Sequence, residues 1–309
     1  MGSLAKAYLS DCGLQGMTRQ SVQSYASNLN DFLRHLERLG VSEVAGIDKD
    51  VIREYIRVLR EERRVSMATI ENHMSTISSF LDYLVFEGIL ESNVALAVRK
   101  RYLKRYKNGD SGDAHSRKLV TTEQLKLLID SIMIPRDKAI ILLLAKTGIR
   151  RGELISIDVD DVDIVGLKIM LKRKAKRSNR LVFFDEECAK VLQNWLRVRE
   201  RYARDGFPAL FITETGGRLE DNGVYLAVTK HAARVGLHDE GSLRLEDHFT
   251  PHCLRHWFTT HLLRNGMPRE MVKELRGDAR KDAIDIYNHI DEEQLRRLYL
   301  ASIPKIGVN

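Results

Sequence analysis

The sequence predicts a mainly α-helical protein with one small antiparallel β-sheet, an α+β fold. All five prolines of the 309 residues lie at or after Pro135, and because proline is rare inside helices, the first 134 residues can be helical. Apolar residues recur there at helical spacing. Between residues 162 and 184, three short runs rich in β-branched and aromatic residues are separated by a glycine turn and a basic segment, which is typical of strands.

The N-terminal half is expected to form helices near residues 3–12, 18–39, 48–62, 66–86 and 93–103. In the second of these, apolar residues follow a three-four rhythm from Val22 to Leu39, and Gly40 stands where a helix commonly ends. These helices would make an all-α domain over residues 1–106. Residues 107–118 are rich in Gly, Asp and Ser and have no apolar rhythm, which indicates a linker.

The second predicted domain covers residues 119–309 and begins at a capping box, Thr121 to Gln124. Strands are expected at 162–164, 168–171 and 181–184, with Gly166 in the first turn and the basic segment in the second. The sheet would then be a small insert in a helical domain. The helices of this domain are expected near 122–134, 136–147, 185–204, 221–235, 252–265, 269–276, 282–288 and 291–301.

Composition restricts the classes of function. The net charge of +7 favours a polyanionic partner. The longest apolar run, Ala139 to Ala145, is too short for a membrane span of about 20 residues, and the N-terminus lacks a secretory pattern. Three cysteines argue against a disulfide framework and for a reducing compartment. We therefore expect a cytoplasmic protein without membrane attachment.

Two runs of nine residues, 99–107 and 172–180, each carry six positive charges and no acid. Such a run can be a solvated surface, but uninterrupted like charges repel one another and favour phosphate as a counter-charge. We therefore expect these runs to contact the phosphate groups of a polyanionic partner. The residues assigned to these contacts are Arg99, Lys100, Arg101, Lys104, Arg105, Lys172, Arg173, Lys176, Arg177 and Arg180.

Four residues far apart in the sequence are suited to chemistry on a phosphodiester: Arg150, His252, Arg255 and Tyr287. Guanidinium groups bind two phosphate oxygens at once, and imidazole exchanges protons near neutral pH. A tyrosine can attack phosphorus where its anion is stabilised. Together they suit the cutting and rejoining of a phosphodiester through tyrosine, with Arg151 as the adjacent alternative to Arg150.

Other polar residues near these motifs allow more than one interpretation. Glu153 follows Arg150 by three residues on the same helical face and can orient it. His256 either orients a partner or packs in the core, with the core slightly favoured. His252 and His256 have a spacing that could suit a metal, but no Glu follows the first histidine and no carboxylate cluster surrounds them. No metal site is expected.

These motifs resemble those of the tyrosine recombinase (phage integrase) superfamily. The resemblance covers residues 147–289 and rests on Thr-Gly-Ile-Arg-x-x-Glu-Leu, a basic hairpin, His-x-x-Arg-His and a tyrosine about 32 residues later. The N-terminal domain resembles the family's core-binding domain by architecture only. The resemblance implies that Tyr287 is the nucleophile and forms a 3′-phosphotyrosyl bond. It also implies a hairpin lysine as proton donor, for which spacing favours Lys174 over Lys176.

Asp278 departs from the family pattern, because the family usually carries His or Trp nine residues before the nucleophile. A carboxylate cannot donate a hydrogen bond to phosphate and would repel it. Either Arg276, Arg280 or Lys281 supplies the missing donor, or the enzyme is slowed or inactive without help. We expect the Asp278→His substitution to raise DNA cleavage.

The resemblance implies a site-specific recombinase that needs neither cofactor nor metal, because the phosphotyrosyl bond retains the energy for religation. The implied partner is double-stranded DNA, bound by a homo-tetramer on two sites, with a monomer or dimer in solution. A type IB topoisomerase and a DNA-binding relative without activity are the alternatives, and Asp278 supports the latter. The tail helix is expected to dock on a neighbouring protomer rather than fold back as a lid.

Overall fold

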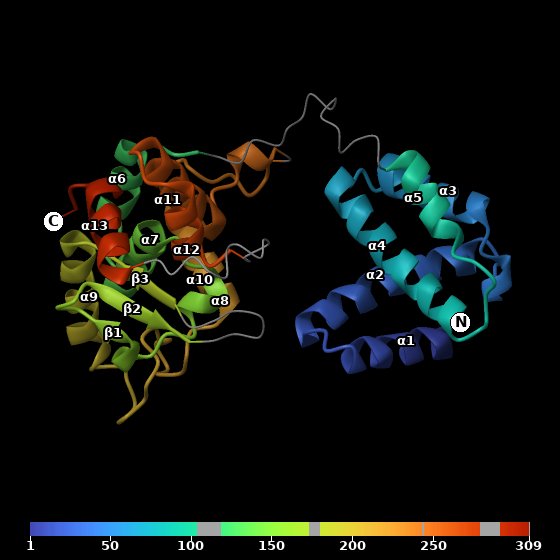
Figure 1. The fold of residues 1–309 in the computed structure, drawn as a ribbon, viewed down its shortest axis with the longest axis horizontal. Coiled ribbons are helices and arrows are strands. Elements are labelled where there is room, and N and C mark those ends of the chain that lie inside the picture. Colours follow the sequence, from blue (N-terminus) through green and yellow to red (C-terminus); the bar gives the residue numbers. More distant parts are fainter. Residues whose placement is uncertain (104–118, 173–179, 243, 279–290, 309) are drawn as a thin grey trace. The chain divides into compact units, whose positions relative to one another are not determined.

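The computed structural model describes residues 1–103, 119–172, 180–242, 244–278 and 291–308 (Figure 1). The chain divides into two compact units, Met1–Ala114 and His115–Asn309. The predicted linker at 107–118 lies outside the described residues. None of the helices in the described ranges combines the length and the apolar character needed to cross a membrane.

The N-terminal unit is entirely helical in its described part, as the sequence predicts. Four of its helices begin where a side-chain oxygen of Thr18, Asp48, Ser66 or Asn93 accepts a backbone N–H of the first turn, which satisfies donors that the helix cannot. The segment predicted as one helix over 48–62 changes to a π-helical turn after Arg57. The helices are α1 (Gly2–Leu14), α2 (Arg19–Arg38), α3 (Lys49–Arg57), α4 (Met67–Phe86) and α5 (Val94–Tyr102).

The core of this unit forms where α4 packs against α1, α2 and α5. Most of the apolar residues at helical spacing are buried or partly buried, among them Phe32 on α2 and Ile77 on α4, whereas Leu39 at the end of α2 is exposed. The polar pair Tyr55 and His73 is also buried, and a 3.0 Å hydrogen bond joins the phenol to Nδ1 of the imidazole. Periodicity therefore identified the buried face of α2 and α4.

The second unit combines helices with a small three-stranded antiparallel sheet, whose strand β3 packs against α7 and α12. The strands are β1 (Val162–Asp163), β2 (Lys168–Leu171) and β3 (Arg180–Phe183), in the order β1-β2-β3 with Ile169 opposite Val162 and Val182. The helix predicted at 282–288 lies outside the described residues. The helices are α6 (Thr122–Asp130), α7 (Pro135–Thr147), α8 (Arg151–Leu154), α9 (Glu186–Arg199), α10 (Asp221–Arg234), α11 (Pro251–Arg264), α12 (Arg269–Arg276) and α13 (Glu292–Ser302).

Helix α7 lies at the centre of this unit and packs against α9 and α11. It is buried almost throughout, so its apolar residues show no single face. The helix ends at Gly148, whose φ of 60° is unfavourable for other residues. A Cβ at this position would lie 2.3 Å from the ring of Phe258. Gly148 therefore fixes how the chain leaves α7 and enters the segment that carries Arg150.

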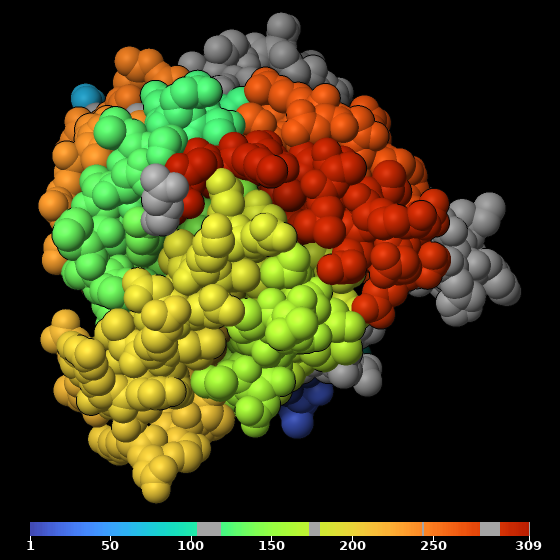
Figure 2. Space-filling view, turned by 90° about the vertical axis from the view of Figure 1, so that its left-hand side faces the viewer, coloured from blue at the N-terminus to red at the C-terminus, as the bar shows by residue number. Residues whose placement is uncertain are grey.

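The C-terminal tail packs on its own unit in this single chain, whereas the sequence favoured docking on a neighbouring protomer. Figure 2 shows the tail (red) lying between α6 (green), α9 (yellow) and α11 (orange). Tyr299 of α13 is fully buried, and the apolar residues Ile303 and Ile306 that follow it are also buried. The phenol of Tyr299 donates to the backbone carbonyl of Lys146 at 2.8 Å. The tail folds back because its apolar face completes the core of its own domain.

A buried lysine adds polar contacts to this docking. Lys146 is fully buried, and its ammonium group lies 2.5 Å from Asp185, 2.8 Å from Glu187 and 2.7 Å from the carbonyl of Pro304. Glu187 in turn accepts backbone N–H groups of the tail at Ile306 and Gly307. A buried charge requires such partners. The tail therefore supplies hydrogen-bond partners for Lys146 of α7 and Glu187 of α9.

Candidate active site

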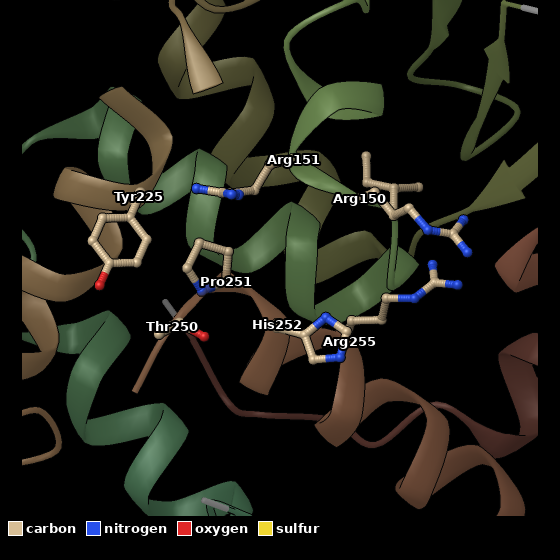
Figure 3. Close-up of a pocket in the computed structure, with 8 residues that line it drawn as sticks. Arg150, Arg151, Tyr225, Thr250, Pro251, His252 and Arg255 are labelled. Atoms are coloured by element: carbon tan, nitrogen blue, oxygen red, sulfur yellow. The ribbon is translucent and has the colours of Figure 1, made fainter. Parts of the chain in front are cut away.

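Arg150 and Arg255 reach the same pocket from different elements. Arg150 is the residue that precedes α8, and Arg255 lies on α11. Figure 3 shows their guanidinium groups side by side, with His252 close to them. The pocket has a volume of about 230 Å³ and is lined by Ile149, Arg150, Arg151, Tyr225, Thr250, Pro251, His252 and Arg255. The structure therefore brings together three of the residues that the sequence singled out.

The start of α11 places His252 and Arg255 beside one another. Pro251 occupies the first helical position, where its missing N–H costs nothing. His252 follows in the first turn, and Arg255 comes three residues later. His252 is exposed to solvent, whereas only 4% of the surface of Arg255 is exposed. The imidazole is thus accessible to a bound substrate, while the arginine is held within the protein.

Backbone carbonyl groups hold both arginines in place. The carbonyl oxygen of Arg276 accepts hydrogen bonds from Nη1 of Arg150 at 3.1 Å and from Nη2 of Arg255 at 2.9 Å. Nη1 of Arg255 also donates to the carbonyl of Gly148. These carbonyls are available because α7 and α12 end there and leave their last acceptors without helical partners. Sequence reasoning missed this role, although Gly148 and Gly277 mark both helix ends.

The side chain of Asp278 lies against the same two arginines. Its Oδ1 atom is 3.3 Å from Nη2 of Arg150 and 3.2 Å from Nη2 of Arg255. Its Oδ2 atom is 3.1 Å from Nε of Arg276, close enough for an ion pair but not aligned as a hydrogen bond. Gly277, with a φ of 59°, turns the chain so that Asp278 faces the site.

An ionised Asp278 cannot donate a hydrogen bond to phosphate, and three basic residues close to it in the sequence are the candidates for supplying that donor. Arg276 is one of the three candidates for it, and its side chain lies beside Asp278. The other candidates, Arg280 and Lys281, lie outside the described residues.

Positive charge accumulates around Arg255. Burial, together with the nearby charges of Arg150 and Arg276, lowers the pKa of Arg255 to about 10, and Asp278 and Glu153 act in the opposite direction. The guanidinium nevertheless stays protonated at neutral pH. A site with several close cations in a partly buried position favours a bound anion, which is the electrostatic character required to hold a phosphate.

Glu153 supports Arg150, as its spacing predicts. Its Oε2 atom accepts the backbone N–H of Arg150 at 2.7 Å, and Oε1 lies 3.6 Å from Nη1 of the same residue. Burial alone would raise the pKa of Glu153, but its hydrogen bonds with Arg180 and Arg150 and their charges outweigh burial and lower the pKa to about 2. Glu153 is therefore ionised at neutral pH and fixes the backbone from which Arg150 projects.

Arg180 is buried, so the structure does not support the predicted contact with DNA. Its two terminal nitrogens donate to the carboxylate oxygens of Glu153 at 2.9 and 3.0 Å, and its Nε donates to the carbonyl of Leu275 at 3.3 Å. A Cβ at Gly277 would lie 2.5 Å from its guanidinium. Arg180 thus connects β3 to α8 and α12. Because Arg180 belongs to a basic run, sequence reasoning assigned it to DNA and missed this structural role.

Arg150, rather than Arg151, faces Arg255. Arg151 forms an ion pair with Asp221 at 3.1 Å and lies over the ring of Tyr225, 5.6 Å from its centroid. Figure 3 shows it pointing away from the arginine pair. The structure therefore separates two neighbouring arginines that residue type alone does not distinguish.

The expectation that His256 packs in the core is wrong. Its side chain is exposed, because it lies one turn from His252 on the outer side of α11, and the two ring centroids are 6.3 Å apart. Cys253 is a buried free thiol. Within the ranges that the structure describes, no group of His, Cys, Asp and Glu side chains could hold a metal ion.

The described residues that were assigned to DNA contacts differ in exposure. Lys100 and Arg101 are exposed near the end of α5, and Arg99 donates a hydrogen bond to Ser75 at 2.9 Å. Lys172 is about half exposed and forms ion pairs with two neighbouring aspartates. The predicted residues outside the described ranges are Tyr287, Lys174, Lys104, Arg105, Arg173, Lys176 and Arg177.

The chain is similar to known proteins over nearly its whole length. The phage integrase family profile matches residues 118–294, and the profile of the phage integrase N-terminal SAM-like domain matches residues 7–88. A tyrosine recombinase XerC from Vibrio parahaemolyticus is 28% identical over 294 residues, which cover 94% of this chain and 89% of that protein.

Two solved structures have the same fold. The Tn1549 transposon integrase in complex with transposon right end DNA has a TM-score of 0.69 at 18% identity, and the match covers 95% of this chain and 97% of the other. The XerH site-specific recombinase bound to its palindromic difH substrate has a TM-score of 0.67 at 22% identity, covering 89% and 78%. At these identities the structural matches establish the fold.

Proposed function

The chain belongs to the phage integrase family, and on this basis we propose that it is a site-specific recombinase that cuts and rejoins duplex DNA through a tyrosine. The observation that carries the proposal is the convergence of Arg150 and Arg255 on one pocket beside His252. A scissile phosphate bound there would meet two guanidinium groups and an accessible imidazole.

The arginines would stabilise the phosphate as it is attacked. The non-bridging oxygens gain negative charge in the transition state, and donors already held in position stabilise that charge most effectively. Arg150 and Arg255 meet this requirement, because the carbonyl of Arg276 holds both of them. Loss of one such donor costs about 10²–10³ in rate.

Tyr287 is the proposed nucleophile. Its oxygen would form a bond to phosphorus at the 3′ side of the break, while the bond from phosphorus to the 5′-oxygen breaks. His252 is suited to move the phenol proton. Lys174, or alternatively Lys176, would give a proton to the leaving 5′-oxygen. The phosphotyrosyl bond retains the energy of the original bond, so religation needs no cofactor.

Double-stranded DNA is the proposed partner. Exposed basic residues, Lys100 and Arg101 among them, are suited to contact the phosphate backbone. We propose that four protomers assemble on two DNA sites and exchange strands, and that the free protein is a monomer or dimer. Its place would be on the chromosomal DNA in the cytoplasm. None of these contacts specifies the sequence of the DNA site, which base contacts and DNA shape determine.

A weakened or inactive DNA-binding relative is the second candidate. The observation that favours it is the carboxylate of Asp278 on both arginines, because this negative charge opposes phosphate binding. Such a protein would bind DNA without forming a covalent product. A type IB topoisomerase would differ from both, because it would relax supercoiled plasmid without requiring two sites.

Covalent capture tests the proposal. The full-length protein would be incubated with a pool of nicked duplexes, in which cleavage beside the nick releases a short fragment and prevents religation. Denaturing gels should show a protein–DNA adduct for the wild type and none for Tyr287→Phe. Tyr202→Phe is the matched control, because this phenol is exposed on the surface and its loss should leave the adduct unchanged.

Two results would contradict the proposal. An adduct that persists in Tyr287→Phe would exclude Tyr287 as the nucleophile. Relaxation of a plasmid that lacks a captured site would favour a topoisomerase, so the captured sequence should be tested in parallel in a two-site recombination assay and a supercoil relaxation assay.

A further inference from the structure

The anion-binding part of the candidate site already contains an anion from the protein itself. The carboxylate of Asp278 lies between three guanidinium groups, with Oδ1 shared by Arg150 and Arg255 and Oδ2 facing Arg276. Its side chain is 31% exposed, so solvent reaches it. Oδ1 here accepts from one Nη atom of each arginine, and these donors would otherwise be available to the oxygens of a phosphate.

The arginines do not depend on Asp278 for their position. The carbonyl of Arg276 accepts from both guanidinium groups, and the carbonyl of Gly148 accepts from Arg255. Glu153 fixes the backbone of Arg150. These contacts remain if the Asp278 side chain rotates away. Asp278 therefore occupies the site without being needed to build it.

The turn that carries Asp278 is also held independently of its side chain. Gly277 ends α12 in the left-handed conformation, and the backbone N–H of Asp278 donates to the carbonyl of Lys273 at 3.2 Å. This is the hydrogen-bond pattern of a common helix end. The carboxylate can thus leave the arginines by rotation about its side-chain bonds, while the helix end and the carbonyl of Arg276 stay in place.

We propose that Asp278 is an internal occupant of the phosphate site, which closes the site in the free protein and leaves the arginines when the scissile phosphate binds. The inference rests on the proposed function, because it assigns a form of regulation to the same site. Phosphate and carboxylate compete for the same donors, and a like charge beside a binding site lowers affinity strongly. The site binds phosphate only in the fraction of molecules whose Asp278 has moved away.

Binding of inorganic phosphate tests this occupancy without DNA. Isothermal titration of the full-length protein would compare the wild type with Asp278→Ala and with Asp278→Asn, which preserves the shape of the side chain. Both variants should bind phosphate about tenfold or more tightly than the wild type, because a competing like charge is removed. Glu270→Gln is the matched control, since Glu270 is exposed in the first turn of the same helix, and it should bind phosphate as the wild type does.

A double variant locates the bound phosphate. Adding Arg255→Ala to Asp278→Ala should abolish the gain in affinity, and a gain that persists would place the phosphate elsewhere and overturn the proposal. Equal or weaker phosphate binding by both single variants, with circular dichroism and melting temperatures confirming that they are folded, would also overturn it.

Adduct formation on nicked duplexes separates this inference from the proposed function. If both hold, Asp278→Ala should form the adduct faster than the wild type in single-turnover experiments. Tighter phosphate binding without an adduct in any variant would support the occupancy and contradict the recombinase. An adduct in the wild type, with unchanged phosphate affinity in both Asp278 variants, would support the recombinase and overturn the occupancy.

Discussion

Oδ1 of Asp278 lies 3.2 Å from Nη2 of Arg255, so a carboxylate of the protein is paired with one of the arginines of the candidate active site. The same oxygen is 3.3 Å from Arg150. Two arginines suited to bind phosphate are therefore paired with an acid before any substrate arrives. Phosphate binding by the two arginines therefore depends on the orientation of the Asp278 side chain.

Replacing Asp278 with histidine should raise the rate of DNA cleavage above that of Asp278→Ala. Both substitutions remove the carboxylate, but only histidine adds a hydrogen-bond donor for the phosphate. The rates would be measured from adduct formation on nicked duplexes under single-turnover conditions. A rate for Asp278→His at or below that of the wild type would indicate that Asp278 has a positive role of its own.

Arg150→Lys should reduce the cleavage rate about 10²–10³-fold, because a lysine cannot replace the two-pronged contact with phosphate oxygens. Arg151→Lys is the matched control, since Arg151 faces Asp221 and Tyr225 instead. We expect its rate to stay close to that of the wild type, because these contacts hold Arg151 away from the arginine pair. Equal losses in the two variants would contradict the assignment of Arg150.

Arg180→Ala should destabilise the second unit by about 3–5 kcal/mol, because it removes the closest ion-pair partner of the buried carboxylate of Glu153. Lys172→Ala provides the comparison from the same basic run. Its exposed ion pairs are worth at most about 1 kcal/mol. Urea unfolding measures both changes. If Arg180 contacted DNA instead, its loss would lower the salt dependence of DNA binding and leave the unfolding free energy nearly unchanged.

Glu153→Gln should show a defect in stability that depends on pH. The folded pKa of Glu153 is about 2, below its ordinary value of 4.5, so its ionisation contributes stability that is fully present above pH 4.5 and is lost as the pH falls towards 2. The difference amounts to roughly 3 kcal/mol at neutral pH. Unfolding free energies of wild type and variant should therefore converge between pH 4.5 and 2. A constant gap over that range would contradict the assignment.

Removing residues 303–309 should destabilise the protein at every concentration. Ile303, Ile306 and Val308 are buried in the same chain, and their loss should cost on the order of 4 kcal/mol. Thermal unfolding of the full-length and shortened proteins over a hundredfold range of concentration would measure this. A stability difference that grows with protein concentration would instead mean that the tail docks on a second protomer in solution.

Local sequence signals predicted most of the secondary structure and the chemical class of the site. Helix positions follow from signals within one or two turns, such as the Thr121 capping box and Gly40, so the predicted helices of the described ranges were found, with differences mainly at their ends. Helix α9, for example, ends at Arg199 rather than near residue 204, where the chain continues in turns. Residue types in ordered motifs identified Arg150, His252 and Arg255, which the structure brings together.

The pairing of those residues depends on how distant parts of the chain pack together. Arg180 and Glu153 are 27 positions apart, and Asp278 lies 128 positions from Arg150. No local sequence pattern predicts these contacts, because they form only when β3, α8 and α12 pack together. The same packing buries Tyr299 and places the tail on its own domain. Burial and long-range charge pairing therefore decided which arginines could meet phosphate, because an ion pair forms only when folding brings both partners to one place.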